Sequence, residues 1–217
     1  MKTRDRILLT SLALFNEEGE PNVTTVDIAS VMDISPGNLY YHFKGKEAII
    51  ESLYLTMEHE LKELLNASDA GSIEAENIWF YLYVLFEAIY KYRFFYRNLS
   101  DLLIRYPDLA KKFRRLLQKK RGTTLATLEL LENNGITELD DVSQQNLANN
   151  ILLVLTYWLN FTELDEQSTT NPTLTIHRGV FQVVSLVAPH LQEDYRAFYR
   201  DCETLFEAIV AELESEG

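Results

Sequence analysis

Apolar residues recur every three or four positions along most of this 217-residue chain, which is the spacing of one face of an α-helix. No segment shows the strict alternation of apolar and polar residues that is typical of a half-buried β-strand. The pattern therefore predicts an all-α protein, with Gly122 as a candidate break in the helix that Pro107 opens. We expect helices over about residues 3–18, 24–32, 36–42, 46–65, 73–99, 107–134, 140–164, 175–188 and 193–213.

The second and third of these helices are short, and each begins with residue types that favour a helix start. Thr24 is placed to cap the first of the two, with Asp27 at its third position. Ser35 is placed to cap the other, and Pro36 falls at its first position, where a missing N–H costs nothing. Two short helices joined by a tight turn, with the second polar and aromatic outside, are typical of a helix-turn-helix.

The outer side of the second short helix, opposite Leu39 and Phe43, carries side chains that suit a nucleic acid. Asn38 can reach a base edge, while hydroxyl and imidazole groups can bond phosphates. Hydroxyls and backbone N–H groups at helix starts also favour an anionic phosphate. Tyr40 has the alternative of packing beneath the first short helix. The candidate DNA contacts are Thr24, Thr25, Ser35, Gly37, Asn38, Tyr40, Tyr41, His42 and Lys46.

Residues 3–57 resemble the DNA-binding part of the tetracycline-repressor (TetR) family of bacterial transcriptional regulators. The matching residues are Thr25, Val26, Ile28, Ala29, Gly37, Asn38, Leu39, Tyr40, Tyr41, His42, Phe43, Lys46 and Glu47. The resemblance implies a homodimer that binds a partly palindromic operator in double-stranded DNA, with a small-molecule cavity in a second domain. Several relatives have a lysine where this chain has Pro36, so one phosphate contact of the family is expected to be missing.

A polar segment at residues 66–72 separates the motif from the larger remainder of the chain. We therefore expect two domains. Residues 1–57 would form a helix-turn-helix DNA-binding domain, and residues 58–217 a helical ligand-binding and dimerisation domain.

Aromatic residues gather on the helices of the expected second domain. Together with the resemblance, they indicate a pocket for a small apolar or amphipathic effector. Aromatic residues at helical spacing also form ordinary cores, and this alternative stays open for each of them. The candidate pocket residues are Trp79, Tyr83, Phe86, Tyr157 and Trp158.

Two apolar stripes near the C-terminus are candidates for a dimer interface. One runs along residues 143–164 and the other along residues 175–188, and two copies of each would form a four-helix bundle around a two-fold axis. Either stripe could instead be buried within one chain. The candidate interface residues are Ile151, Leu155, Trp158, Val180, Val184 and Val187.

The net charge of −13 is unusual for a DNA-binding protein, but its distribution is uneven. Residues 1–57 hold five Lys or Arg against eight Asp or Glu, so most of the acidic excess lies elsewhere. Charges farther away than roughly 10 Å are largely screened in 0.1 M salt, so the cations near the motif set its attraction to DNA. These cations are Lys2, Arg4, Arg6, Lys44 and Lys46. A denser basic cluster within residues 111–121 predicts a solvated helical face, or alternatively a surface for acidic partners. Its members are Lys111, Lys112, Arg114, Arg115, Lys119, Lys120 and Arg121.

The chain lacks the spacings that mark common catalytic and metal sites, such as HExxH or a phosphate-cradling glycine loop, so no catalytic residue, metal or cofactor is expected. A single cysteine, Cys202, fits a reducing cytoplasm, and no apolar run is long enough to indicate membrane insertion. We expect a cytoplasmic repressor that a small ligand releases from DNA. The alternatives are an activator of the same fold, an adaptor that uses residues 111–121, and a helical enzyme.

Overall fold

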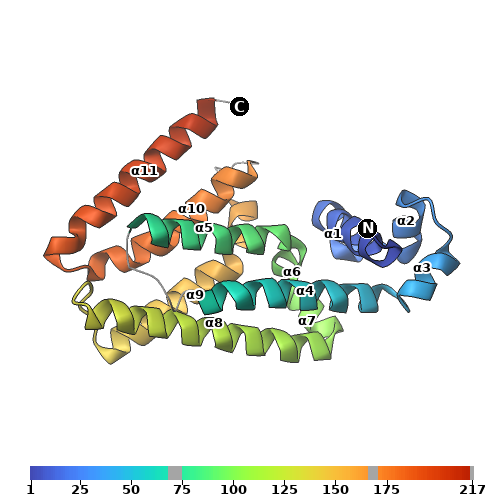
Figure 1. Cartoon of the computed structure of the whole chain (residues 1–217), viewed down its shortest axis with the longest axis horizontal. Helices are drawn as coiled ribbons and strands as arrows, with labels where there is room; N and C mark the ends of the chain where they lie inside the picture. Colours follow the sequence, from blue (N-terminus) through green and yellow to red (C-terminus); the bar gives the residue numbers. More distant parts are fainter. Residues whose placement is uncertain (68–74, 166–170, 216–217) are drawn as a thin grey trace. The chain divides into compact units, whose positions relative to one another are not determined.

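The computed structural model describes residues 1–67, 75–165 and 171–215, and over these ranges the regular secondary structure is helical throughout (Figure 1). The elements are α1 (Thr3–Glu18), the 3-10 helix η1 (Glu20–Asn22), α2 (Thr25–Val31), α3 (Pro36–His42), α4 (Lys46–Ala67), α5 (Ala75–Lys91), α6 (Arg93–Arg97), α7 (Leu99–Arg105), α8 (Pro107–Asn133), α9 (Asp141–Leu164), α10 (Pro172–Val187), η3 (Ala188–His190), η4 (Glu193–Tyr195) and α11 (Arg196–Ser215). The expected all-α class is confirmed. In the part of the chain that the structure describes, no helix is both long and apolar enough to span a bilayer.

The chain folds into two compact units whose limits differ from the two expected domains. The first unit combines Met1–Leu61 with Tyr92–Arg114, and the second combines Lys62–Lys91 with Arg115–Gly217. Helices α4 and α8 therefore contribute residues to both units. A single boundary near residue 57 does not describe this arrangement, because residues 92–114 pack with the N-terminal segment.

The core of the first unit explains why a later segment of the chain joins it. Phe94, Phe95 and Tyr96 are consecutive and fully buried. The ring of Phe94 lies 5.2 Å from that of Phe15, and the backbone N–H of Phe94 donates to Asn16 Oδ1 at 3.1 Å. Three consecutive buried residues cannot share one face of a long helix. The single helix expected over 73–99 is instead divided into α5, α6 and the start of α7, with the breaks at Tyr92 and Asn98 on either side of this buried run.

Two further differences concern where helices begin and continue. Helix α10 starts at Pro172, inside the expected loop, because Asn171 Oδ1 accepts hydrogen bonds from the N–H groups of Thr173 at 2.9 Å and Leu174 at 3.3 Å. Helix α8 continues through Gly122 without interruption. The polar break expected at 66–72 lies mostly outside the described residues, and α4 extends to Ala67.

In the second unit, α10 packs against α5, α9 and α11. Its Gly179 lies where a Cβ atom would come within 2.6 Å of Phe86 Cε1 and 2.9 Å of the Trp158 ring. Because Gly179 has no side chain, α10 can approach α5 and α9 closely at this point. Cys202 of α11 is buried in the same unit, and burial together with the nearby Asp201 carboxylate raises the pKa of its thiol to about 11.

Candidate functional site

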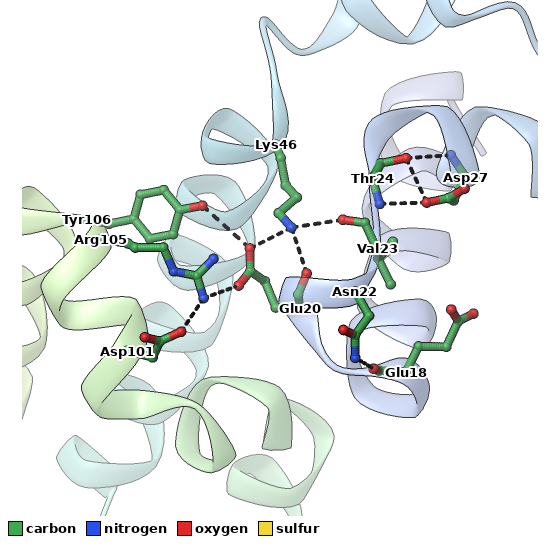
Figure 2. Close-up of polar contacts among 10 residues, drawn as sticks. All are labelled: Glu18, Glu20, Asn22, Val23, Thr24, Asp27, Lys46, Asp101, Arg105 and Tyr106. Atoms are coloured by element: carbon green, nitrogen blue, oxygen red, sulfur yellow. Dashed lines mark hydrogen bonds and ion pairs between the residues drawn. The ribbon is translucent and has the colours of Figure 1, made fainter.

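Helices α2 and α3 are fixed at their starts by the side chains that the sequence marks as caps. Thr24 Oγ1 accepts from the Asp27 N–H at 3.2 Å, and the Thr24 N–H donates to Asp27 Oδ2 at 2.8 Å, which completes a capping box (Figure 2). These bonds hold the pKa of the Asp27 carboxyl below its usual value. Ser35 Oγ accepts from the Asn38 N–H at 3.1 Å at the start of α3.

The capping box changes the interpretation of the α2 start. The expected role for Thr24 and Thr25 was to favour a DNA phosphate at this helix end. The Asp27 carboxylate already occupies the anion-favouring position and also accepts the Thr24 hydroxyl at 2.7 Å. In this structure Thr24 acts as a helix cap. The start of α3 carries no acidic residue in its first turn, so Ser35, Gly37 and Pro36 leave that end open to an anion.

Helix α3 separates its buried and exposed residues sharply. Leu39 is buried within α3, and so is Phe43, which directly follows the helix. On the opposite side Asn38 is exposed, Tyr40 is 57% exposed and Tyr41 is 77% exposed. Tyr40 is thus a surface residue, and the core alternative for it is wrong. Helix α3 presents an amide and two phenols to solvent.

Two side-chain contacts order this surface. The Lys44 ammonium lies 4.7 Å from the centroid of the Tyr40 ring, and the rings of Tyr41 and His42 meet edge to face with centroids 5.2 Å apart. Such contacts reduce the number of rotamers that a long or aromatic side chain samples. Lys2, Arg4 and Arg6 of the N-terminal segment are also exposed.

Lys46 does not lie on this surface as expected. Its ammonium donates to the backbone carbonyl oxygens of Glu20 at 2.6 Å and Val23 at 2.8 Å, and it lies 2.8 Å from Glu20 Oε1 (Figure 2). An ammonium has three N–H donors, and these three acceptors use them all. The expected phosphate contact of Lys46 is therefore replaced by a structural role, since the charge is needed inside the unit.

The partner of Lys46 is a buried glutamate that the sequence pattern did not single out. Glu20 is fully buried in η1, and its second carboxylate oxygen lies 2.9 Å from a guanidinium nitrogen of Arg105 (Figure 2). Burial and the Glu20 charge raise the pKa of the neighbouring Tyr106 phenol. The cluster ties the chain before α2 to the start of α4 and the end of α7. Periodicity carries no signal for it, because Glu20 lies between helices.

Four of the five aromatic residues expected to line a ligand pocket contact other residues of the second unit, and the fifth, Tyr157, is partly exposed. Trp79 and Tyr83 contact the His177 ring, with centroids 6.1 Å and 4.8 Å away, and burial lowers the pKa of that histidine. Trp158 Nε1 donates to the Thr175 carbonyl at 2.9 Å. Phe86 is buried beside Gly179, whereas Tyr157 is 46% exposed on α9.

A cavity of about 340 Å³ lies elsewhere in the second unit, and none of those five residues lines it. Its apolar walls come mainly from α5, α8, α9 and α10: Ile78, Leu82, Leu85, Leu128, Leu131, Ile151, Leu155, Val183, Val184 and Val187. Its polar lining is Asn77, Tyr81, Lys120, Thr123, Thr124, Thr127 and Tyr195. The volume falls within the range of small-molecule sites.

The residues expected at the dimer interface are mostly inside one chain. Ile151, Leu155, Val180 and Val184 are buried in the single protomer, and Ile151, Leu155, Val184 and Val187 line the cavity. Trp158 and Val187 are half-buried. The expectation that Ile151, Leu155, Val180 and Val184 contact a partner is wrong, because these side chains are already buried in their own chain.

A different face of α9 is apolar and exposed. It consists of Leu153, Tyr157, Phe161 and Leu164, spaced four, four and three residues apart, which places them on one side of the helix. Helix α9 thus carries apolar residues on two opposite faces. Only the inner one is covered within the protomer.

The basic cluster at residues 111–121 is largely engaged within the chain. Lys111 pairs with Asp108 at 2.9 Å, Lys112 pairs with Glu51, and Arg121 donates to Gln145 at 2.9 Å. Lys120 is buried. Among the described residues there is also no group of three or more His, Cys, Asp or Glu side chains placed to hold a metal ion.

Comparisons with known proteins find similarity to bacterial regulators over nearly the whole chain. Residues 7–53 match the profile described as bacterial regulatory proteins of the tetR family, and residues 56–199 match the profile described as bacterial transcriptional repressor. The crystal structure of a TetR-family transcriptional regulator from Marinobacter aquaeolei VT8 is 34% identical in sequence. It aligns with a TM-score of 0.85 over 96% of this chain and 98% of its own.

Curated relatives match over shorter segments. The probable acrEF/envCD operon repressor of Escherichia coli K12 is 28% identical over 74 residues, covering 34% of this chain and 33% of that protein. The HTH-type transcriptional regulator UidR of the same organism is 42% identical over 53 residues, covering 24% of this chain and 27% of that protein. The chain spans between about a quarter and a half of the length of the curated relatives that it matches.

Proposed function

The chain belongs to the TetR family of bacterial regulatory proteins, and we propose that it is a sequence-specific DNA-binding repressor of transcription. Members of this family are DNA-binding regulators rather than enzymes. The single observation that carries the proposal is the exposed side of α3. It presents Asn38, Tyr40 and Tyr41 to solvent from a helix that is capped by Ser35 and anchored by buried Leu39.

In the proposed complex α3 lies in the major groove of operator DNA. Asn38 contacts a base edge, whereas Tyr41 and His42 donate to phosphates. The α3 start, with Ser35 and Gly37, favours a further phosphate as a helix N-terminus. Lys44 takes the cationic role that had been expected of Lys46, because its ammonium is exposed beside Tyr40. The proposed site of action is the cytoplasm, where chromosomal DNA is accessible.

A single head of this kind touches few base pairs, so we propose that two copies bind together as a homodimer. The exposed face of α9, with Leu153, Tyr157, Phe161 and Leu164, is the proposed contact between the copies. An exposed apolar stripe on a helix is stabilised when a second copy covers it around a two-fold axis. This face replaces the inner stripe of α9 and the Val180–Val184 stripe of α10.

The proposed effector site is the cavity lined by α5, α8, α9 and α10. Helices α4 and α8 contribute residues both to the unit that holds the cavity and to the unit that holds α3. A ligand that prefers one arrangement of these helices changes the affinity for DNA by that preference. The proposal is that an effector releases the protein from its operator.

The test is selection of bound sequences from a random DNA pool, followed by footprinting of the selected site. The expected result is a partly palindromic site with half-sites about one helical turn apart. Tyr41→Ala should weaken binding to all sequences alike, about ten-fold, whereas Asn38→Ala should relax the choice of base at one position per half-site. Arg114→Ala, at an exposed residue of α8, is the control. Recovery of no enriched sequence would reject the proposal.

The direction of regulation is tested separately by transcription in vitro from a promoter that carries the selected site. A repressor lowers transcript yield when it is added, and an activator raises it. The adaptor alternative has less support, because Lys111, Lys112 and Arg121 already contact other residues of the chain and Lys120 is buried.

A further inference from the structure

The α5 residues that line the cavity of the second unit form a polar row and an apolar row. Asn77 and Tyr81 lie four positions apart on the polar row, and Leu82 and Leu85 lie three positions apart on the apolar row. Asn77 is exposed and Tyr81 is half-buried, whereas both leucines are buried. The α5 wall is therefore polar near solvent and apolar in the interior.

Helix α8 shows the same division. Thr123 and Thr127 lie four positions apart and line the cavity with hydroxyl groups, while Leu128 and Leu131 line it with hydrocarbon. Thr123 is half-buried and Thr127 is exposed, but Leu128 and Leu131 are buried. The polar residues of both helices thus form a rim near solvent, which consists of Asn77, Tyr81, Thr123 and Thr127.

Helices α9 and α10 form the floor of the cavity. Among the described lining residues, those from these two helices are all aliphatic. Val187 is half-buried, and the others are buried; these are Ile151, Leu155, Val183 and Val184. Because the polarity of the lining follows its exposure, a bound molecule is most stable with its apolar part on the floor and its polar part at the rim.

The described lining offers no unused charge to an ionised ligand. It contains no carboxylate and no imidazole, and its single charged residue, Lys120, already makes an interaction within the chain. An ionised group that leaves water without meeting an opposite charge loses hydration free energy. The lining therefore favours an uncharged molecule.

Thr127 also sets the direction of a hydrogen bond at the rim. Its hydroxyl donates to the Thr123 carbonyl oxygen at 3.0 Å, so the hydroxyl hydrogen is already used and Oγ1 keeps its capacity to accept. A ligand can bond this oxygen only by donating a hydrogen. A hydroxyl group can do so, whereas a carboxylate cannot.

We infer that the cavity binds an uncharged amphiphile whose hydroxyl head donates to Thr127 at the rim and whose hydrocarbon tail lies on the floor formed by α9 and α10. The aliphatic floor provides the apolar surface that such a tail requires. This inference rests on the proposed role of the cavity as the effector site, and it names the chemical class and the orientation of the effector.

The experiment titrates the full-length protein at neutral pH with octanol, octanoate and octyltrimethylammonium by isothermal calorimetry. Octanol should bind the wild type at least ten-fold more tightly than either ion. Thr127→Val removes the accepting oxygen with little change of shape and should weaken octanol binding about three- to ten-fold. Thr204→Val is the matched control, because Thr204 is an exposed threonine of α11 whose hydroxyl also donates to the carbonyl four residues earlier, and octanol affinity should not change.

Val184→Phe tests the floor. The larger side chain occupies part of the cavity and should weaken octanol binding at least ten-fold. If circular dichroism shows that this variant does not fold, Val187→Phe repeats the test at a half-buried lining residue.

Binding of either ion as tightly as octanol would overturn the inference, as would absence of octanol binding to the wild type. Unchanged octanol affinity in Thr127→Val or in the folded phenylalanine variant would also overturn it. These readouts need no DNA. A failure of the proposed repressor function therefore appears separately, as absence of operator binding by a protein that still binds octanol.

Discussion

Glu20, Lys46 and Arg105 form a small group of charges whose anionic member is buried without any exposure. The Glu20 carboxylate lies 2.8 Å from the Lys46 ammonium and 2.9 Å from the Arg105 guanidinium. A buried ion pair contributes little net stability compared with apolar residues, but removal of one partner leaves a poorly compensated charge. At the residue scale, this cluster holds the chain that enters α2.

Glu20→Gln keeps the size of the side chain and removes its charge, so Lys46 and Arg105 lose their shared anion. We expect the free energy of unfolding to fall by about 3 kcal/mol. Chemical denaturation with urea measures the change. Asp101→Asn is the matched control, because Asp101 pairs with Arg105 at an exposed position and should cost less than about 1 kcal/mol. Equal losses in the two variants would show that burial does not set the energy of this cluster.

The contribution of Lys120 to the free energy of unfolding, unlike that of the Glu20 cluster, is expected to depend on pH. The folded chain binds the Lys120 proton less tightly, with a pKa of about 8 instead of 10.5. Between these pH values the unfolded chain holds more protons, so the contribution of this group to stability rises with pH. Below pH 8 its full cost is present. The difference in stability between Lys120→Met and the wild type should therefore depend on pH, and it should shift in favour of the wild type as the pH rises from 8 towards 10.5.

The shift arises because, above pH 8, the folded wild type no longer carries the buried charge, while the unfolded chain still binds the proton. Thermal melts of both proteins across this range measure it. Lys119→Met should change stability little at any pH, since its side chain is exposed. A loss of stability in Lys120→Met at pH 7 would mean that the ammonium makes a net favourable contribution in the absence of ligand.

At the scale of elements, α3 depends on its cap more than a long helix would. It has seven residues, and its start is stabilised by the hydrogen bond from the Asn38 N–H to Ser35 Oγ. Ser35→Ala should lower the free energy of unfolding by about 1 kcal/mol. Operator affinity should fall as well, because fraying of the first turn displaces Asn38.

The control for the cap is Ser30→Ala, at an exposed serine near the end of α2, where alanine is the better helix former. It should leave stability unchanged or slightly raised. Urea denaturation and a binding titration on the selected site measure both variants. If Ser35→Ala and Ser30→Ala were indistinguishable, the cap would contribute nothing to α3.

Helix boundaries were largely predictable from the sequence because local residue types decide them. The bounds of α1 and α3 match the prediction, and Thr24 and Ser35 cap as expected. The breaks at Tyr92 and Asn98 were not predictable, since neither position has a glycine or proline and the residues between them contact side chains distant in sequence. For the same reason the sequence could not show that Lys46 and Lys120 point inwards.

The sequence also could not show which face of α9 is buried within the protomer. Apolar side chains occur on both of its sides, so periodicity identifies two stripes without saying which one the protomer covers. The stripe through Ile151 and Leu155 turned out to be the inner one. The exposed residues of α3 were predictable because only one side of that helix is apolar.

At the scale of the whole molecule, the proposed dimer is testable through the outer stripe of α9. Phe161 is 58% exposed within the protomer, and Phe161→Glu would place a charge in the proposed contact. We expect this variant to sediment as a monomer, and its operator affinity to fall by at least ten-fold because the two heads are no longer linked. Analytical ultracentrifugation at micromolar concentration measures the first effect.

Phe80→Glu makes the same substitution at an exposed phenylalanine of α5 and should leave the dimer intact. If Phe80→Glu produced monomers and Phe161→Glu did not, the contact between copies would lie on another face. Val184→Arg is not a suitable test of the interface, because Val184 is buried beside the cavity and its replacement would disturb the fold of one chain.

The buried thiol of Cys202 has a practical consequence for following this molecule in solution. The thiolate is the reactive form of cysteine, and a pKa of about 11 makes it scarce at neutral pH. Cys202 is also the single cysteine of the chain. A spin label would therefore attach almost only to a cysteine introduced at an exposed site such as Ser30. In a dimer, the distance between the two labels would report the separation of the two heads directly.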